Sequence, residues 1–229
     1  MSSMPEWQWD EFRQVGTDYA DAAEVERYEQ RMGQFRNIAA EDADILTELA
    51  LTPPSRILEI GTGTGHFARC AGKAGHHVAA VDVSPAMLDY ARARASADGL
   101  AQVQFHHAGF LNLPFDPSSF DAAVTVAALH HLPDVWKAVA LANIHRVLKP
   151  GGRLVLRDIA FSWSHADHSS CFDAFVESCP ASMRHEAQRH IAKEYSTLDW
   201  IMLGLLEHAG FRRISVQHDG SMMKCIYEK

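Results

Sequence analysis

The chain of 229 residues has no surplus of positive charge and no long apolar run. Its 21 Lys and Arg residues are outnumbered by 29 Asp and Glu residues, so the formal net charge is −8 with His neutral. Binding to duplex nucleic acid depends on many contacts between basic side chains and phosphates, so we expect no nucleic-acid partner. The longest apolar stretches, such as residues 122–129, fall well short of the roughly 20 residues that cross a bilayer, which predicts no membrane span.

The sequence also lacks features that would export or cross-link it. Its N-terminus, MSSMPEWQWDEF, has no basic segment followed by an apolar run, so we expect no signal peptide and a cytoplasmic protein. The cysteines, Cys70, Cys171, Cys179 and Cys225, show no CxxC spacing and are expected to be reduced thiols. The HxxHxxC spacing of His165, His168 and Cys171 stands alone in a chain with 14 His, so no metal site is predicted there.

Short β-branched runs alternate with helical patterns through the middle of the chain. Strands are expected over residues 56–60, 77–82, 103–107, 120–126 and 153–159. Alternation of this kind predicts an α/β fold with a doubly wound, Rossmann-like sheet. Two further strand-like segments, 212–218 and 221–227, are joined by Asp219-Gly220, which is typical of a hairpin. We therefore expect a seven-stranded sheet in which one strand runs antiparallel.

The chain is expected to form a single domain with four parts. These are an N-terminal helical cap (1–54), a core that holds the ligand (55–160), a helical lid insertion (161–195), and a closing helix and hairpin (196–229). The lid is read as two helices broken at Pro180 and lying over the carboxyl edge of the sheet, because a structureless connection of this length is improbable. The closing helix is expected over residues 197–209, with Ser196 and Asp199 as its capping box.

A glycine-rich turn follows the first expected strand. Residues 61–65 read GTGTG, and glycines permit a positive φ and a close approach of the backbone to a ligand. A dinucleotide site of the GxGxxG type needs a glycine where this chain has His66. Asp82 ends the second strand 21 residues after Gly61, a position from which a carboxylate can accept hydrogen bonds from both ribose hydroxyls of an adenosine. The pattern therefore favours an adenosine-containing ligand without a pyrophosphate.

Four segments carry a more specific signal: LEIGTGTG (58–65), VDVSPAMLDYAR (81–92), LPFDPSSFDAAVTVAALHHLPD (113–134) and VLKPGGRLVL (147–156). Together they resemble the class I S-adenosylmethionine-dependent methyltransferases, in particular the small-molecule enzymes similar to the ubiquinone and menaquinone methyltransferase group. The resemblance implies S-adenosylmethionine as cofactor and an SN2 transfer of its methyl group to a small-molecule acceptor. Neither the acceptor nor the oligomeric state can be read from the sequence.

The same resemblance implies a set of cofactor contacts. The loop formed by Gly61, Thr62, Gly63 and Gly65 would line the methionine part of the cofactor, supported by Glu59, and Asp82 would hold the ribose. Val83, Met87, Ala108, Gly109 and Phe110 would lie beside the adenine, and Ala127 under the sulfonium. Tyr19 would either cover the cofactor or pack on the first helix.

Gly109 departs from the family pattern, which usually has Gly-Asp where this chain has Ala108-Gly109. The acid that accepts a hydrogen bond from the adenine amino group is therefore missing, and loop carbonyls or a water must replace it. On this interpretation Gly109→Asp strengthens cofactor binding by roughly 5- to 30-fold. If Gly109 instead needs a positive φ, strain cancels that gain.

His130 and His131 follow the fourth strand, at the crevice where ligands of doubly wound folds bind. Either could accept a proton during methyl transfer, or both could shape the pocket wall. The sequence alone does not exclude two other functions. One is a non-catalytic protein that binds S-adenosylmethionine or S-adenosylhomocysteine, which the missing acid favours. The other is a nicotinamide-dependent oxidoreductase, which His66 and the closing hairpin disfavour.

Overall fold

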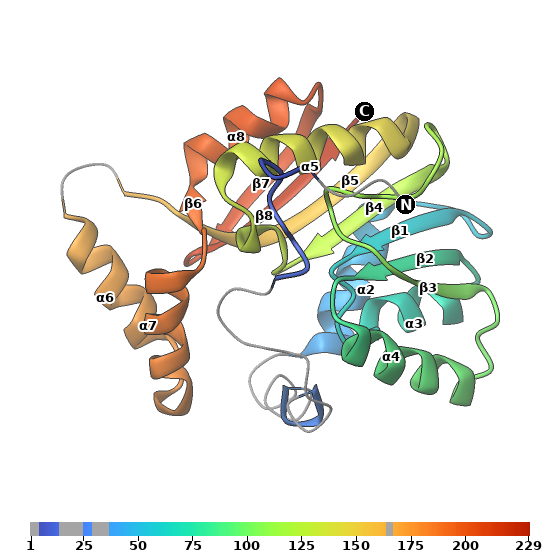
Figure 1. Ribbon diagram of the computed structural model, residues 1–229, viewed down its shortest axis with the longest axis horizontal. Coiled ribbons are helices and arrows are strands. Elements are labelled where there is room, and N and C mark those ends of the chain that lie inside the picture. Colours follow the sequence, from blue (N-terminus) through green and yellow to red (C-terminus); the bar gives the residue numbers. More distant parts are fainter. Residues whose placement is uncertain (1–4, 14–24, 29–36, 164–166) are drawn as a thin grey trace.

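The computed structural model describes residues 5–13, 25–28, 37–163 and 167–229 (Figure 1). Residues 25–28 are helical. The strands are β1 (Arg56–Ile60), β2 (His77–Asp82), β3 (Val103–His107), β4 (Phe120–Val126), β5 (Leu148–Phe161), β6 (Thr197–Leu198), β7 (Arg212–Asp219) and β8 (Met222–Glu228). The α-helices are α2 (Ile38–Leu49), α3 (His66–Lys73), α4 (Pro85–Ala97), α5 (Asp134–Val147), α6 (His168–Ser178), α7 (Arg184–Lys193) and α8 (Asp199–His208). The described residues also include two short 3₁₀ turns, Leu129–His131 and Ala181–Met183.

The main sheet has the strand order β3-β2-β1-β4-β5-β8-β7, and the two-residue β6 pairs with β5 outside this path. The pairs among β1 to β5 are parallel, whereas β8 runs antiparallel to both β5 and β7. The doubly wound sheet with one antiparallel strand is thus confirmed, including the hairpin at Asp219-Gly220. Because the chain moves outward from β1 to β3 and then returns to place β4 on the other side of β1, the order reverses between β1 and β4, which is where such sheets bind ligands.

Helices cover both faces of the sheet (Figure 1). Alternate residues of each buried strand point to opposite faces, so Leu58 and Ile60 of β1 join the core under α5 and α8, while Ile57 joins the core under α2 and α3. Parallel strands covered on both faces are apolar almost throughout, and in β1 the four residues after Arg56 are buried. These two apolar layers hold the carboxyl ends of the strands in fixed positions.

Two helix starts differ in how they are capped. α4 begins at Pro85, where the hydroxyl of Ser84 accepts a hydrogen bond from the backbone N–H of Met87 and Pro85 occupies the first turn. The capping box at Ser196 and Asp199 is wrong: α8 begins at Asp199 after Leu198, and no side chain caps it. Residues 197–198 pair with β5 instead, and Ser196 contacts His190.

The insertion after β5 contains the two expected helices, α6 and α7, separated at Pro180 (Figure 1). α6 has no buried residue, and Ala187 is the one buried residue of α7. Both ends of the insertion are fixed to the core at one place, because Phe161 at the end of β5 pairs with Leu198 in β6. The insertion is therefore a hairpin of helices with a common base, and it projects from the carboxyl edge of the sheet.

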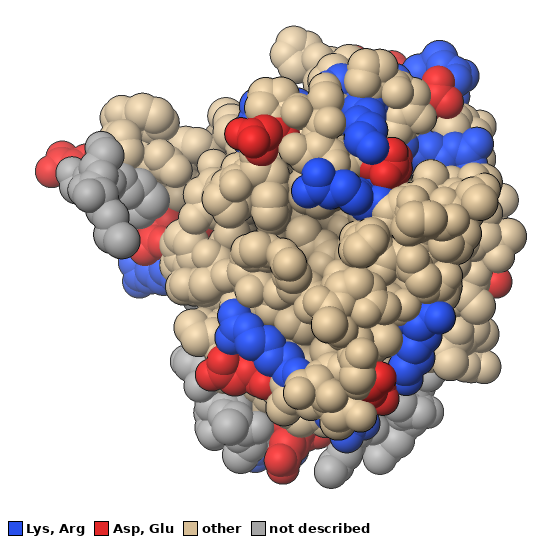
Figure 2. Space-filling view, turned by 90° about the vertical axis from the view of Figure 1, so that its right-hand side faces the viewer, with Lys and Arg blue, Asp and Glu red and all other residues tan. Residues whose placement is uncertain are grey.

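In the part of the chain that the structure describes, no helix is both long and apolar enough to span a membrane. On the face shown in Figure 2, Lys and Arg side chains are interspersed with Asp and Glu side chains and do not form a separate basic patch. The expectation that nucleic acid is not a partner stays a prediction.

Candidate functional site

A cavity opens at the carboxyl ends of β1 to β4, at the point where the strand order reverses. The residues that line it come from the ends of these strands and from the N-terminal part of the chain: Trp9, Glu11, Arg13, Tyr28, Ile60, Gly61, Gly63, Asp82, Val83, Met87, Ala108, Gly109, Phe110, Val126, Ala127, Ala128, His131 and Leu132. Most of these side chains are apolar, and Glu11 and Asp82 add two carboxylates. A mainly apolar cavity with a few placed polar groups is typical of a small-molecule site.

The glycine turn after β1 forms one wall of this cavity. The backbone N–H groups of Gly61 and Thr62 both donate to the Val81 carbonyl, which ties the turn to the end of β2. Gly61 has φ +75°, and a Cβ there would lie 2.4 Å from the Cβ of Ala128. A side chain at this position would collide with the loop after β4 and strain the backbone, so the close approach requires glycine.

Gly65 has a different place from the one that the resemblance implied. It does not line the cavity but precedes α3, with φ +75°, and a Cβ on it would lie 2.8 Å from the Cβ of Ala91 in α4. Its role in the structure is to let two helices pack closely.

Glu59 and Thr62 lie beneath the turn rather than on the cavity wall. The Thr62 hydroxyl donates to Glu59 Oε2 at 2.6 Å, and both side chains are buried. Burial, with smaller contributions from Asp42 and Asp82, raises the pKa of Glu59 to about 8. Glu59 is therefore mainly protonated at neutral pH, and it supports the turn as an uncharged hydrogen-bonding group.

Asp82 stands at the end of β2 with both carboxylate oxygens held by the backbone. Oδ2 accepts from the N–H of Gly63 and Oδ1 from the N–H of Ser84, each at 2.8 Å. Burial raises the pKa of Asp82, and these backbone hydrogen bonds oppose that effect. Each oxygen keeps a lone pair for a further donor, so the side chain can accept two hydrogen bonds from a ligand in the cavity.

The space beside Gly109 is filled by a carboxylate from the N-terminal part of the chain. A Cβ on Gly109 would lie 2.3 Å from Glu11 Oε2 and 2.4 Å from Glu11 Cδ. The N–H of Leu111 donates to both oxygens of Glu11, at 3.1 and 3.0 Å. Burial raises the pKa of Glu11 to about 7 despite these hydrogen bonds.

This arrangement corrects the account of Gly109 that the sequence suggested. Gly109 has no positive φ, so backbone conformation is not the reason for glycine. An aspartate at 109 would also meet the carboxylate of Glu11, so Gly109→Asp alone is no longer expected to strengthen ligand binding. An acid is present in this part of the cavity, but it comes from residue 11.

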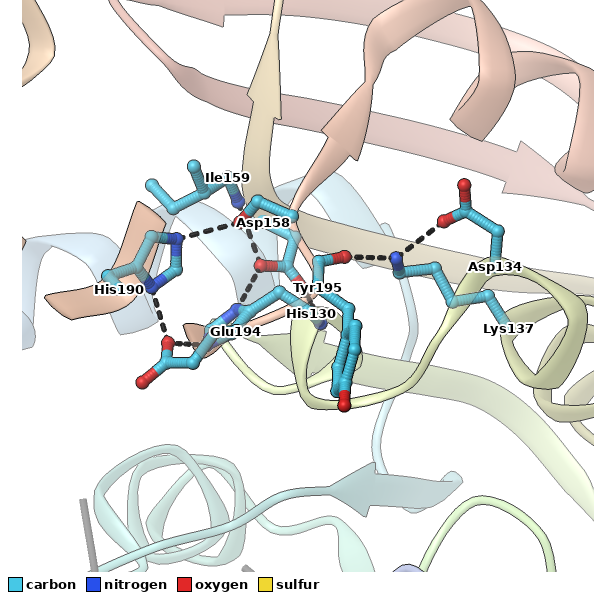
Figure 3. A network of polar contacts seen from close by, with 9 residues as sticks. His130, Asp134, Lys137, Asp158, Ile159, His190, Glu194 and Tyr195 are labelled. Atoms are coloured by element: carbon cyan, nitrogen blue, oxygen red, sulfur yellow. Dashed lines mark hydrogen bonds and ion pairs between the residues drawn. The ribbon is translucent and has the colours of Figure 1, made fainter. Parts of the chain in front are cut away.

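The two adjacent histidines have separate surroundings. His131 lines the cavity, and burial together with the positive charge of His130 lowers its pKa to about 4. His130 does not line the cavity, because its ring lies among Asp158, Glu194 and His190 (Figure 3). Burial lowers the pKa of His130, but Asp158 and Glu194 outweigh it and raise the pKa to about 9.

Most of the residues expected at the site thus meet around one cavity. Gly61, Gly63, Asp82, Val83, Met87, Ala108, Gly109, Phe110, Ala127 and His131 line it, whereas Glu59, Thr62, Gly65 and His130 lie behind its walls. Tyr19 lies outside the described residues. Sequence reasoning missed Glu11, Arg13 and Tyr28, since no local motif links the N-terminal part of the chain to the loops of the sheet. The one available signal was the missing acid at Gly109.

Comparisons with known proteins agree on one family. A model of a methyltransferase domain matches residues 57–152. An uncharacterised methyltransferase of Geobacillus sp. strain WCH70 is 30% identical over 203 residues, covering 88% of this chain and 90% of the relative. A demethylmenaquinone methyltransferase of Clavibacter sepedonicus is 39% identical over 114 residues, covering 49% of this chain and 45% of the relative. The fold is shared with Haemonchus contortus phosphoethanolamine N-methyltransferase 2 in complex with S-adenosyl-L-methionine, with a TM-score of 0.71 and 22% identity over 93% of this chain and 47% of that chain.

Proposed function

The chain belongs to the class I S-adenosylmethionine-dependent methyltransferases, and from this we propose that its cavity binds the cofactor and that the enzyme methylates a small molecule. The observation that carries the proposal is Asp82, whose two oxygens are fixed by backbone N–H groups and still face the cavity. The positive-φ glycines Gly61 and Gly63 lie next to it and expose backbone rather than side chain.

The residues present fit an adenosyl group. Asp82 would accept hydrogen bonds from the two ribose hydroxyls, as acids at this position of nucleotide-binding folds do. Val83, Met87 and Phe110 give an apolar wall against which the adenine would lie. Glu11 would accept the hydrogen bond from the adenine amino group in place of the acid that position 109 lacks. Glu11 is thus our candidate for a cofactor residue donated by the N-terminal part of the chain.

When bound, S-adenosylmethionine supplies an electrophilic methyl group on a sulfonium. The chain's own residues would align this group with the acceptor and exclude water, which together provide most of the rate when the acceptor is already nucleophilic. Ala127, which has φ +51°, and Ala128 form the wall at the end of β4, where we place the sulfonium. His131 lines the same wall and is our candidate for contact with the acceptor.

The variant Asp82→Ala tests the cofactor site. Loss of a charged acceptor for two hydroxyls is expected to cost about 2 to 4 kcal/mol, or roughly 30- to 1,000-fold in affinity. Calorimetry with S-adenosylhomocysteine measures this directly. Asp89→Ala, a change on the exposed surface of α4, is the matched control and should bind as the wild type does. If the Asp82→Ala protein binds S-adenosylhomocysteine within twofold of the wild-type affinity, Asp82 is not a cofactor-binding residue.

The two alternative functions, an oxidoreductase and a non-catalytic binding protein, are weighed against the same observations. A nicotinamide oxidoreductase is not favoured by the family to which the chain belongs. A non-catalytic cofactor-binding protein was suggested by the missing acid at Gly109, and Glu11 removes that argument. Incubation with methyl-labelled S-adenosylmethionine and candidate oxygen, nitrogen, sulfur and carbon nucleophiles separates an enzyme from a binding protein. Turnover of any of them supports the enzyme.

A further inference from the structure

A second group of chemically active side chains lies outside the cavity, between the core and the lid. His130, His190 and Glu194 each offer one ligand atom, and these three atoms lie within 4.8 Å of one another (Figure 3). His130 follows β4, His190 is on α7, and Glu194 follows that helix. All three side chains are at most 13% exposed, so this is not a solvated charged surface.

Asp158 holds the ring of His130 in one orientation. Its Oδ1 lies 2.6 Å from His130 Nδ1, and its Oδ2 accepts the backbone N–H of the same histidine at 3.1 Å. The N–H of Ile159 also donates to Oδ1, so the carboxylate is itself fixed. With Nδ1 engaged, Nε2 is the ring nitrogen that faces Glu194, at 3.3 Å from Oε2.

His190 is held in a corresponding way from the other side. Its Nε2 lies 2.7 Å from the hydroxyl of Ser196, and its Nδ1 contacts the same Oε2 of Glu194. Each imidazole therefore has its outer nitrogen anchored by an oxygen and its inner nitrogen directed at a shared point. This is the arrangement of metal-binding histidines, whose second ring nitrogen almost always bonds to an oxygen that orients the ring.

The spacing of the three atoms is close to that of a coordination site. Ligands bound at about 2.0 to 2.2 Å from a tetrahedral ion lie roughly 3.3 to 3.6 Å from one another. The separation of His130 Nε2 and Glu194 Oε2 is 3.3 Å, and all three candidate ligand atoms lie within 4.8 Å of one another, so small shifts of the side chains would bring them to this spacing. Two imidazoles and one carboxylate suit a divalent first-row transition ion such as Zn²⁺ and leave at least one position open.

We propose that His130, His190 and Glu194 form a binding site for a divalent transition-metal ion, with Asp158 and Ser196 orienting the two histidines. The site joins the core to α7, because its ligands come from the loop after β4 and from the lid. It shares no ligand residue with the cavity: the ring of His131, which lines the cavity, is a neighbour of His130 at 4.4 Å between ring centroids, but it is not one of the ligands.

Titration of the chelator-treated chain with Zn²⁺ in a calorimeter tests the proposal, and Co²⁺ provides a visible absorption spectrum that reports the number and kind of ligands. The wild type is expected to bind one equivalent of Zn²⁺. His190→Ala, His130→Ala and Glu194→Gln should each weaken this binding by at least roughly 10-fold, and Ser196→Ala and Asp158→Asn by about 10- to 100-fold. Circular dichroism checks that each variant folds. If an alanine variant does not fold, Glu194→Gln still tests the proposal, because it keeps the shape of the side chain.

Two exposed side chains of the lid give matched controls. His185 lies on α7 with His190, and Glu177 lies on α6. His185→Ala and Glu177→Gln should bind Zn²⁺ and Co²⁺ as the wild type does. The proposal is overturned if the wild type binds neither ion, if the ligand variants bind as tightly as the controls, or if the controls lose as much affinity as the ligand variants.

Discussion

Gly109 and Glu11 show how one residue's chemistry depends on another far away in the chain. The glycine leaves a space that the carboxylate of Glu11 fills, and the N–H of Leu111 holds that carboxylate in place. A second acid at 109 would put two carboxylates in contact inside a partly buried site, where like charges repel strongly. The two positions are therefore best treated as alternatives for one role.

Moving the carboxyl group from position 11 to position 109 tests whether the two residues are alternatives for one role. At pH 8, above the Glu11 pKa of about 7, Glu11→Ala should weaken the binding of S-adenosylhomocysteine by about 1.5 to 3 kcal/mol, or roughly 10- to 150-fold, because a hydrogen bond to a charged acceptor is lost. Gly109→Asp alone should give no gain. The double variant Glu11→Ala/Gly109→Asp should recover at least roughly 10-fold over Glu11→Ala, since the new side chain then has the vacated space.

Glu6→Ala, an exposed change in the same part of the chain, is the control for this series and should leave affinity unchanged. Calorimetric affinities and melting temperatures of all four variants distinguish a lost contact from a general loss of stability. Tighter binding by Gly109→Asp alone would show that Glu11 does not occupy the adenine position.

At the scale of elements, the lid differs from the helices of the core in how it is held. α5 and α8 bury apolar residues against the sheet, whereas α6 buries none. The base of the lid is fixed by the β5 and β6 pair and by Lys137 of α5, whose buried ammonium group bonds to Asp134 and to the carbonyl of Tyr195. Elements with little buried apolar surface open at low free energy, so the lid is the part of the described chain best suited to move.

Hydrogen exchange should therefore be faster in α6 and α7 than in α5, and it should slow in the lid when S-adenosylhomocysteine binds. The physical link is the contact between His131 in the cavity wall and His130, which reaches Glu194 at the end of the lid. Amides of α8, which buries Met202 and Leu206 in the core, serve as the internal control. Protection confined to residues 61–65 would contradict a gating role and leave the lid as a structural insertion.

At the scale of the whole molecule, two carboxyl groups make stability depend on pH. The pKa of Glu59 is about 8 and that of Glu11 about 7, both raised from 4.5 mainly by burial. The folded chain therefore holds protons that the unfolded chain has released between pH 4.5 and 8. The stabilisation from these groups is fully present below pH 4.5 and is lost as the pH rises through 7 and 8, by up to about 1.4 kcal/mol per pH unit for each group.

Glu59→Gln isolates the larger of these two effects. The amide keeps a hydrogen-bond partner for Thr62 but does not titrate, so the free energy of unfolding should fall less steeply between pH 6 and 8.5 than in the wild type. Urea unfolding at a series of pH values gives both slopes. Glu48→Gln, a change at a partly exposed ion pair with Arg157, is the comparison and should keep the slope of the wild type. Equal slopes for Glu59→Gln and the wild type would mean that Glu59 is ionised in the folded chain.

The sequence by itself determined the features that depend on a single segment. β1 to β4 begin and end where the apolar pattern predicts, because each strand is recognisable from its own residues and flanking turns. The glycine turn and the position of Asp82 follow for the same reason. Only the tertiary structure decided that Gly65 packs against α4, that Glu11 fills the space beside Gly109, and that His190 and Glu194 meet His130. These are contacts between segments far apart in the chain, and packing of the whole fold, rather than any local period or motif, determines which distant side chains meet.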